Sequence, residues 1–436
     1  MKTNVRYIAL MTVMAVCGCL QLAAQKQRSE QFRDKYQLQE VVALSRHNVR
    51  APLSDASSPV GRLTPHKWIE WTAPKSELTL HGGVLETMMG QYFRKWLEDA
   101  GMFPENCVPT TDDVNITANS MQRCIATAQY FTAGFMPTAG LRINHRFTPS
   151  RMDPLFLPQL TKAGQAYEAL VMEQINEATG GKGLEGFSRS LQPDFELIAE
   201  VLDAIDSPMM KSDSPDKQIL ANHSPQPRFD LFAEPGLLGG SALQLFGSAS
   251  DALSLQYYEQ PDSLAASFGH PLTHEQWKRI AGVKDAYMEL LFDVPAVGVN
   301  VARPLIQYIY DELRAPTRRF TLLVGHDSNL AFVSSALGIE PYELPGSIEK
   351  RTPIGSKIVF EKFVDADGGE WADVNIVYQS ADQLRHTTPL TLDTPPMIYQ
   401  LSLRGLERNA DGLYPMADLL KRFHDTLHAY DELPSE

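Results

Sequence analysis

The chain has 436 residues, of which 43% are hydrophobic and 21% are charged. This length and composition are typical of a globular protein of two or three domains, and they exclude collagen-like and low-complexity chains. With 39 basic and 53 acidic residues the formal net charge is −14, so the chain has no overall electrostatic footprint for nucleic acid or an anionic membrane. Positive charge that binds an anionic substrate must therefore be gathered locally.

The first 24 residues have the pattern of an export signal. Lys2 and Arg6 make the start basic, an apolar run over 8–20 follows, and small residues precede Gln25. Because the run is shorter than the roughly 20 apolar residues of a membrane-spanning helix, we expect a cleaved signal peptide over 1–24, an exported protein and no membrane span. A lipoprotein with an anchor at Cys19 is the alternative.

Predicted strands and helices alternate at both ends of the chain. Buried strands are expected over 38–45, 114–118 and 320–324, and further strands over 357–360 and 374–378. Helices are expected over 82–100, from Asn119 or Ser120 onward, over 192–205, over 273–291 with a capping box, from near Asp327 or Ser328 and over 414–424. The pattern predicts an α/β class fold, with a sheet domain flanked by helices over 25–150 and 290–436 and a smaller, mostly α-helical insertion domain over 151–289.

The cysteine content predicts a protein that does not depend on disulfides. Cys17 and Cys19 lie in the export signal, which leaves Cys107 and Cys124 in the mature chain. The strand expected over 114–118 separates these two and argues against a bridge, although the sequence alone leaves one open.

Polar residues with a shared chemistry stand where three of the predicted strands end. They are Arg46, His47 and Arg50, then Arg123, then His326 and Asp327. In open α/β sheets, ligands bind outside the carboxyl ends of the strands. Guanidinium groups match phosphate oxygens, imidazole can act as a nucleophile, and a carboxyl group can act as a general acid. The set predicts phosphoryl transfer through a covalent histidine intermediate, with no metal or other cofactor.

Two of these segments resemble the motifs of a known family. RHNVRAP at 46–52 resembles the RHxxRxP signature of the histidine acid phosphatases, branch 2 of the histidine phosphatase superfamily, and His326-Asp327 resembles their distal HD pair. Further stretches are similar to the bacterial periplasmic glucose-1-phosphatases: HGGVLE (81–86), ANSMQRCIATAQ (118–129), LQYYE (255–259), RTPIGSKIVF (351–360) and VYQSADQLR (377–385). The resemblance extends over about residues 36–425.

The resemblance implies a role for each site residue. His47 would be the nucleophile that becomes phosphohistidine, and Asp327 would donate the proton to the leaving oxygen. The phosphoryl oxygens would be bound by Arg46, Arg50, Arg123 and His326. The family also implies a periplasmic location, an α/β domain with an inserted α domain, and a position at the pocket mouth for Glu259, where it could contact the sugar.

The chain departs from the family pattern in its cysteines and after the signature proline. Leu53 stands where phytases of the family usually carry Thr, which favours sugar phosphates over phytate. Cys107 matches a half-cystine of the enteric relatives, but its expected partner region over 137–140 has none. We therefore expect a metal-independent phosphomonoester hydrolase acting on glucose 1-phosphate and related sugar phosphates. The alternatives are a broad-specificity acid phosphatase, a phytase-like inositol-phosphate phosphatase and a phosphate-ester binding protein without activity.

Overall fold

The computed structural model describes residues 28–148, 151–211, 216–238 and 240–435. The predicted signal peptide, with Cys17 and Cys19, lies outside the described residues. Cys107 and Cys124 are both free thiols, as the strand expected between them predicts.

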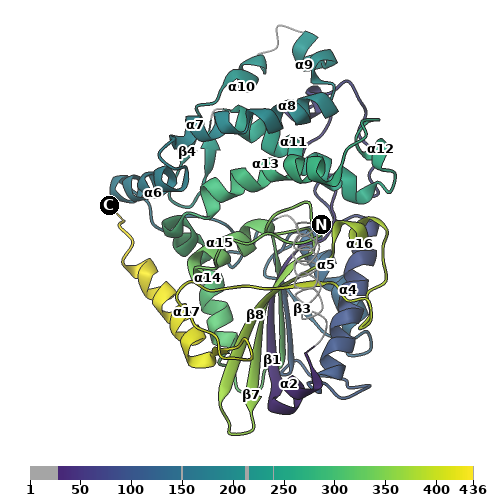
Figure 1. The fold of residues 1–436 in the computed structure, drawn as a ribbon, viewed down its shortest axis with the longest axis vertical. Helices are drawn as coiled ribbons and strands as arrows, with labels where there is room; N and C mark the ends of the chain where they lie inside the picture. Colours follow the sequence, from purple (N-terminus) through teal and green to yellow (C-terminus); the bar gives the residue numbers. More distant parts are fainter. Residues whose placement is uncertain (1–27, 149–150, 212–215, 239, 436) are drawn as a thin grey trace, which may run out of the picture.

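Eight of the described strands form one mixed sheet (Figure 1). These strands are β1 (Tyr36–Arg46), β2 (Val114–Ala118), β3 (Ile143–Asn144), β6 (Phe320–Gly325), β7 (Lys357–Asp365), β8 (Glu370–Tyr378), β9 (Met397–Gln400) and β10 (Tyr414–Pro415). Their order is β10-β8-β7-β1-β6-β2-β3, and β9 also pairs with β8. The strands β1, β6, β2 and β3 are parallel, whereas β7 to β10 pair antiparallel. The parallel strands consequently end together at one edge of the sheet.

Helices cover both faces of this sheet. They are α2 (Glu30–Lys35), α4 (Leu80–Asp99), α5 (Gln122–Phe135), α14 (Pro295–Glu312), α15 (Asp327–Leu337) and α17 (Met416–Asp431). Two short helices, α3 (Pro59–Arg62) and α16 (Ala381–Arg385), lie against helix α11 (Ala242–Glu259) instead. Side chains alternate along β1: Val42 and Leu44 share a core with α14, α15 and α17, whereas Val41 and Ala43 share a second core with α4 and α5. Successive side chains of a strand point to opposite faces of the sheet, so a sheet covered on both faces requires apolar residues at both sets of positions.

The stretch between β3 and α14 adds no strand to the main sheet. Its elements are α6 (Gln165–Ala178), α7 (Gly183–Ser190), α8 (Gln192–Val201), η1 (Ala204–Asp206), α9 (Pro208–Lys211), α10 (Lys217–Ala221), β4 (Gln226–Arg228), β5 (Gly236–Leu238), α11 (Ala242–Glu259), α12 (Ser263–Ala266) and α13 (His274–Phe292). The strands β4 and β5 pair only with each other. In Figure 1 these helices lie above the sheet, at the end where the parallel strands stop.

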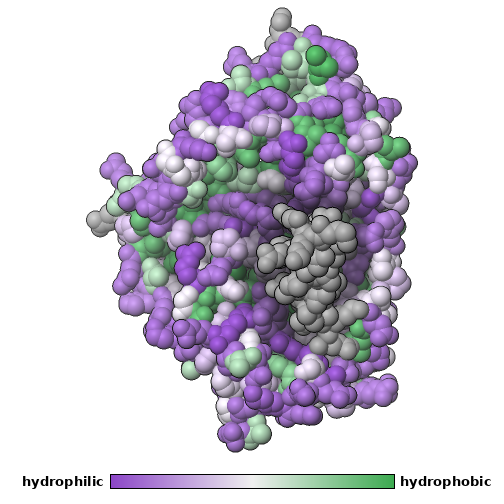
Figure 2. Space-filling view, in the orientation of Figure 1, coloured by the Kyte–Doolittle hydropathy of each residue, from purple (hydrophilic) through white to green (hydrophobic). Residues whose placement is uncertain are grey.

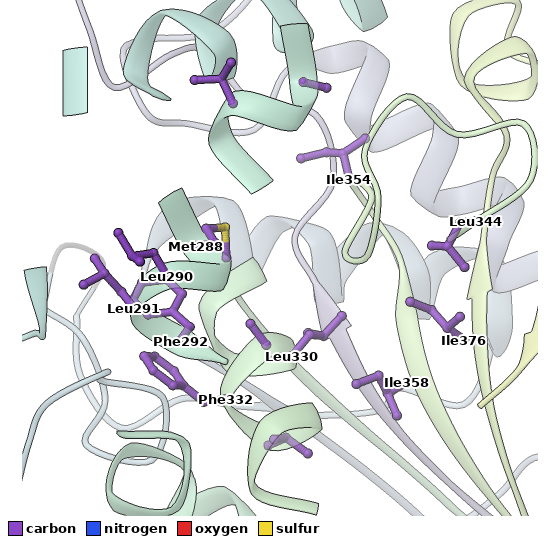
Figure 3. Close-up of a cluster of buried hydrophobic side chains, with 14 of the residues drawn as sticks. Met288, Leu290, Leu291, Phe292, Leu330, Phe332, Leu344, Ile354, Ile358 and Ile376 are labelled. Carbon is purple, nitrogen blue, oxygen red and sulfur yellow. The ribbon is translucent and has the colours of Figure 1, made fainter. Parts of the chain in front are cut away.

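The helical stretch and the sheet share one hydrophobic core. Figure 3 shows residues from the end of α13, such as Phe292, beside Leu330 and Phe332 of α15 and near strand residues of the sheet. The ring centroids of Phe292 and Phe332 are 4.4 Å apart. The division into domains at 150 and 290 therefore stays a prediction, because buried contacts run across it.

The α/β fold predicted from the sequence is confirmed, with corrections at three helix ends. The helix after β2 begins at Gln122, because Asn119 and Ser120 use their side chains for tertiary bonds to His326 and the Phe147 amide. The helix predicted over 192–205 ends at Val201. The helix predicted from Tyr414 begins at Met416, since Tyr414 and Pro415 form β10.

The described surface gives no sign of a spanning segment. Among the described residues, every helix is too short or too polar to cross a bilayer. On the face drawn in Figure 2, hydrophilic residues predominate and hydrophobic ones appear in separate groups.

The loop that follows β1 rests on a fully buried ion pair. Lys357 Nζ of β7 lies 2.8 Å from Glu86 Oε1 of α4, and both side chains are 0% exposed. Glu86 Oε2 accepts a 2.8 Å hydrogen bond from Asn48 Nδ2 in the loop. One turn earlier in α4, a Cβ at Gly82 would meet the Val49 carbonyl oxygen at 2.3 Å. The loop is thus held by α4 and β7 together.

Breaking this ion pair should destabilise the protein. We expect Lys357→Met to lower the free energy of unfolding by about 3–5 kcal/mol, because it leaves the buried Glu86 carboxylate without its cation. Urea unfolding of the variant measures the loss. The double variant with Glu86→Gln should recover part of it, and a loss below about 1 kcal/mol in the single variant would contradict this account.

Candidate active site

The predicted site residues meet because three parallel strands end at the same level. Arg46, the last residue of β1, pairs in register with Gly325, the last residue of β6. On the other side of β6, Ala118 at the end of β2 pairs with Val324. The residues that follow β1 and β6 are His47 and His326, whose ring centroids are 5.5 Å apart. Strand register alone therefore brings distant sequence motifs together.

His47 is held as a neutral imidazole with one nitrogen free. Its Nδ1 lies 2.9 Å from the Asn48 carbonyl oxygen, which can only accept, so Nδ1 carries the proton and Nε2 keeps its lone pair. The side chain is buried, and burial together with the charges of Arg123, Arg50 and Arg46 holds its pKa well below the usual value. A neutral imidazole with a fixed tautomer is what a histidine nucleophile needs.

His326 is fixed in the same way by Asn119. The Asn119 Oδ1 accepts from the Asp153 amide, so its Nδ2 donates to His326 Nε2 at 2.7 Å. The His326 proton is therefore on Nδ1, which lies 3.4 Å from Arg123 Nη2. Two donors at that distance are placed to share one acceptor oxygen. Burial and Arg123 lower the pKa of His326 to about 3, so the ring is neutral.

Two of the predicted arginines are anchored by carboxylates. Arg46 Nη1 lies 2.5 Å from Glu349 Oε1 and 2.6 Å from the Thr352 carbonyl oxygen. Arg50 Nη2 donates to Asp251 Oδ2 of α11 at 2.9 Å. Arg123, in the first turn of α5 as the sequence predicts, reaches only the Ser76 carbonyl at 3.4 Å among described main-chain acceptors.

Each of these three arginines also keeps an unused donor. The Nε atoms of Arg46, Arg50 and Arg123 are buried and have no hydrogen-bond partner among the described residues. A buried donor without a partner costs about 1–3 kcal/mol, more for a charged group. Because the charges of these three arginines also act on the same imidazole, that of His47, we interpret the cluster as a site for an anion. The set can neutralise and orient a phosphoryl group.

Asp327 begins helix α15 and faces a cavity of about 280 Å³. Its Oδ1 accepts from the Ser328 amide at 2.9 Å, and its Oδ2 lies 2.7 Å from Lys284 Nζ and 3.3 Å from Arg46 Nη2. Burial raises the pKa of this carboxyl group, but the charges of Lys284 and Arg46 outweigh burial and hold the pKa well below its usual value. The cavity is also lined by Leu53 and Asp251.

Glu259 lies apart from this cluster. It ends helix α11, where Oε2 accepts from the Thr79 hydroxyl at 2.9 Å and lies 3.5 Å from His81 Nδ1. It does not line the cavity that holds Asp327. A direct contact of Glu259 with substrate therefore stays a prediction, and its visible role is to bind the cap of α4 behind the loop.

Four further residues of the site lie outside the predicted set. Asn119 and Glu349 orient His326 and Arg46, while Asp251 and Lys284 enter from helices α11 and α13. Asn119 lies in the family-like stretch 118–129, but the sequence predicts for it only the role of a helix cap. The other three carry no local motif, because their position depends on how the helices of 242–292 pack over the strand ends.

Metal ligands are not part of this arrangement. Within the residues that the structure describes, no group of three or more His, Cys, Asp or Glu side chains is placed to hold a metal ion.

Comparison with known proteins gives the same assignment. The family described as Histidine phosphatase superfamily (branch 2) matches residues 37–178. A glucose-1-phosphatase of Salmonella typhimurium is 36% identical over 92% of this chain and 95% of that protein, and the phytase AppA of Escherichia coli is 30% identical over 89% and 91%. The structure of Hafnia alvei phytase, apo form, superimposes with a TM-score of 0.81 at 27% identity, covering 92% of this chain and 99% of that chain.

Similarity of this extent, on a sheet whose strand ends carry an arginine-lined anion site, defines a phosphomonoester hydrolase. The chain belongs to the histidine phosphatase superfamily, branch 2, and the family predicted from its motifs is confirmed.

The two neutral histidines predict how stability depends on pH. A histidine with a folded pKa near 3 and an unfolded pKa near 6.5 binds its proton first in the unfolded chain, so stability falls as pH drops from about 6.5 to 3. We expect His326→Asn to make the slope of unfolding free energy against pH shallower by about 1.4 kcal/mol per pH unit between pH 4 and 6. Urea unfolding at several pH values measures both slopes, and equal slopes would show that His326 is not held neutral.

Proposed function

We propose that this protein hydrolyses phosphate monoesters of sugars, glucose 1-phosphate first among them, through a phosphohistidine at His47. The observation that carries the proposal is the set of three buried guanidinium Nε donors around a neutral imidazole whose Nε2 is free. A phosphoryl group bound to Arg46, Arg50 and Arg123, with His326 Nδ1 as a fourth donor, would place its phosphorus in front of that lone pair.

The proposed chemistry balances without a metal. His47 Nε2 forms a bond to phosphorus while the bond from phosphorus to the alkoxide oxygen breaks, and Asp327 passes a proton to that oxygen. Water then attacks phosphorus while the bond from phosphorus to His47 Nε2 breaks. Asp327 accepts the proton of that water and passes it to the departing phosphate, so the carboxyl group is ionised again when inorganic phosphate leaves. The guanidinium groups offset the charge on the phosphoryl oxygens in both steps.

The leaving-group side of the cavity supports an uncharged polyol rather than a polyphosphate. Besides Asp327, the carboxyl groups of Asp251 and Glu234 line it, and the cations Lys284 and Arg50 contact Asp251. A second phosphate on the leaving group would meet these carboxylates, which repel it. Leu53, 52% exposed beside them, offers no hydroxyl to such a phosphate. The relatives at 35–36% identity are glucose-1-phosphatases, which favours the same substrate class.

An inositol-phosphate phosphatase is the second candidate. The structural likeness to Hafnia alvei phytase and the 30% identity to phytase AppA favour it.

A substrate panel separates the two candidates. We expect kcat/KM for glucose 1-phosphate to exceed that for phytate by at least about tenfold, because one repelling pair at the cavity is worth roughly 1.4 kcal/mol or more. Glucose 6-phosphate and p-nitrophenyl phosphate complete the panel, and all assays are repeated in EDTA. His47→Ala, which lacks the nucleophile, should show no turnover and no acid-trapped phosphoenzyme. Preference for phytate, or activity that needs added metal, would contradict the proposal.

The role proposed for Asp327 predicts a dependence on the leaving group. A sugar alkoxide needs a proton as it departs, and general acid catalysis contributes about 10²–10⁴-fold, whereas p-nitrophenolate departs without that help. Asp327→Asn should therefore slow phosphoenzyme formation from glucose 1-phosphate far more than from p-nitrophenyl phosphate. Rapid-quench measurement of the first turnover with both substrates tests this. Equal slowing would show that another group donates the proton.

Export to the periplasm is proposed from residues 1–24 alone. The intact mass of the exported protein distinguishes a chain that begins at Gln25 from one that carries lipid on Cys19.

A further inference from the structure

Lys284 is a cation at the centre of the site that no sequence motif contains. It comes from helix α13, in the helical stretch, and its side chain is 13% exposed. Its Nζ lies 2.7 Å from Asp327 Oδ2, 3.1 Å from Asp251 Oδ1 and 3.8 Å from Glu349 Oε1. The ammonium group therefore binds directly to Asp327, the residue proposed above as the general acid.

In the substrate-free protein, both carboxylate oxygens of Asp327 face hydrogen-bond donors. Oδ1 is occupied by the Ser328 amide at the N-terminus of α15, which itself favours a negative charge. Oδ2 is shared by Lys284 and Arg46. Further charged or titratable groups act on this carboxyl group or on Lys284. They are His47 and His326 after the strands, Arg123 and Cys124 of α5, Asp251 of α11, Asp285 of α13, Glu234 before β5 and Glu349 before β7.

We propose that Lys284 is a positioning residue for the general acid: it keeps Asp327 ionised and fixed in place until a phosphate ester carrying its own proton enters the pocket. The proposal rests on the phosphatase function proposed above. In substrate-free protein the proton shared by the two groups stays on Lys284.

The proton count then fixes which ionic form of the substrate reacts. The monoanion ROPO₃H⁻ binds to enzyme with Asp327 ionised, and its phosphoryl proton moves to Asp327 Oδ2. As His47 Nε2 bonds to phosphorus, that proton passes to the departing oxygen and ROH leaves. One proton enters with the substrate and leaves with the alcohol, so the total charge is conserved.

The electrostatics agree with this order of events. Lys284 heads the groups that lower the pKa of Asp327, and Asp327 and Asp251 in turn raise the pKa of Lys284 against its burial. The acidic limb of kcat/KM against pH reports Asp327 in free enzyme, and the alkaline limb reports the substrate's second ionisation near pH 6. Lys284 therefore widens the working range on its acidic side.

The test is a pH profile of Lys284→Met. A cation within 4–6 Å lowers a carboxyl pKa by about 1–3 units, so its removal should move the acidic limb up by about 1–3 pH units and leave the alkaline limb in place. Lys284→Arg keeps the charge and should keep the wild-type limb, which a merely structural role would not predict. Lys278→Met on the same helix is the matched control and should change nothing. Lys278 is half-buried, lies 3.9 Å from both Glu275 and Glu343, and does not line the cavity.

The substrate for this profile is glycerol 2-phosphate, whose alkoxide needs a proton although it is not a sugar. If the enzyme hydrolyses glycerol 2-phosphate but not glucose 1-phosphate, the proposed substrate class is wrong, and the role of Lys284 can still be tested. A uniform drop in kcat/KM at every pH would overturn that role, because it would mean direct substrate binding.

A double variant gives an independent check. If Lys284 acts through Asp327, Lys284→Met should cost at least tenfold less in kcat/KM at pH 4 when added to Asp327→Asn than when made in wild type. An equal cost in both backgrounds would overturn the proposal. Thermal unfolding at each pH identifies any variant that is not folded, in which case Lys284→Gln, closer in shape and polarity, replaces it.

Discussion

Three guanidinium groups converge on one buried space, and the charge they bring has to be balanced wherever water is excluded. Glu349 and Asp251 bind two of them directly, and Asp327 contacts Arg46 as well. These carboxylates occupy the Nη donors, and the Nε donors stay available. Positive charge therefore remains at the site and attracts an anion. It does so although the whole chain carries a net charge of −14.

The parts of this site that follow a strand could be predicted from the sequence. A buried strand has a recognisable run of apolar residues, and parallel strands in register deliver whatever comes next to a common edge. His47 and His326 are 279 positions apart, yet both directly follow residues that pair in β1 and β6. The capping box at Thr273 was predictable for the same reason, because both of its partners lie within one helical turn.

Residues whose role depends on packing could not be found in this way. Lys284 and Asp251 are placed by the way α13 and α11 lie over the strand ends, which no local pattern encodes. Asn119 has the chemistry of a helix cap, but tertiary bonds to His326 and the Asp153 amide prevail over that local preference. Glu259 matched a family position, while its contacts in the fold are with Thr79 and His81.

Two separate stretches of the chain contribute to the lining of the cavity. The segments after the strands supply Arg50, Asp327 and Ser328, and helices α11 and α13 supply much of the remaining lining. Mutation in residues 242–292 can consequently alter which alcohol is accepted while the nucleophile and its arginines persist. Lys284 and Asp251 are the positions at which the two stretches are coupled, because each lies on a helix of the helical stretch and contacts a residue that follows a strand.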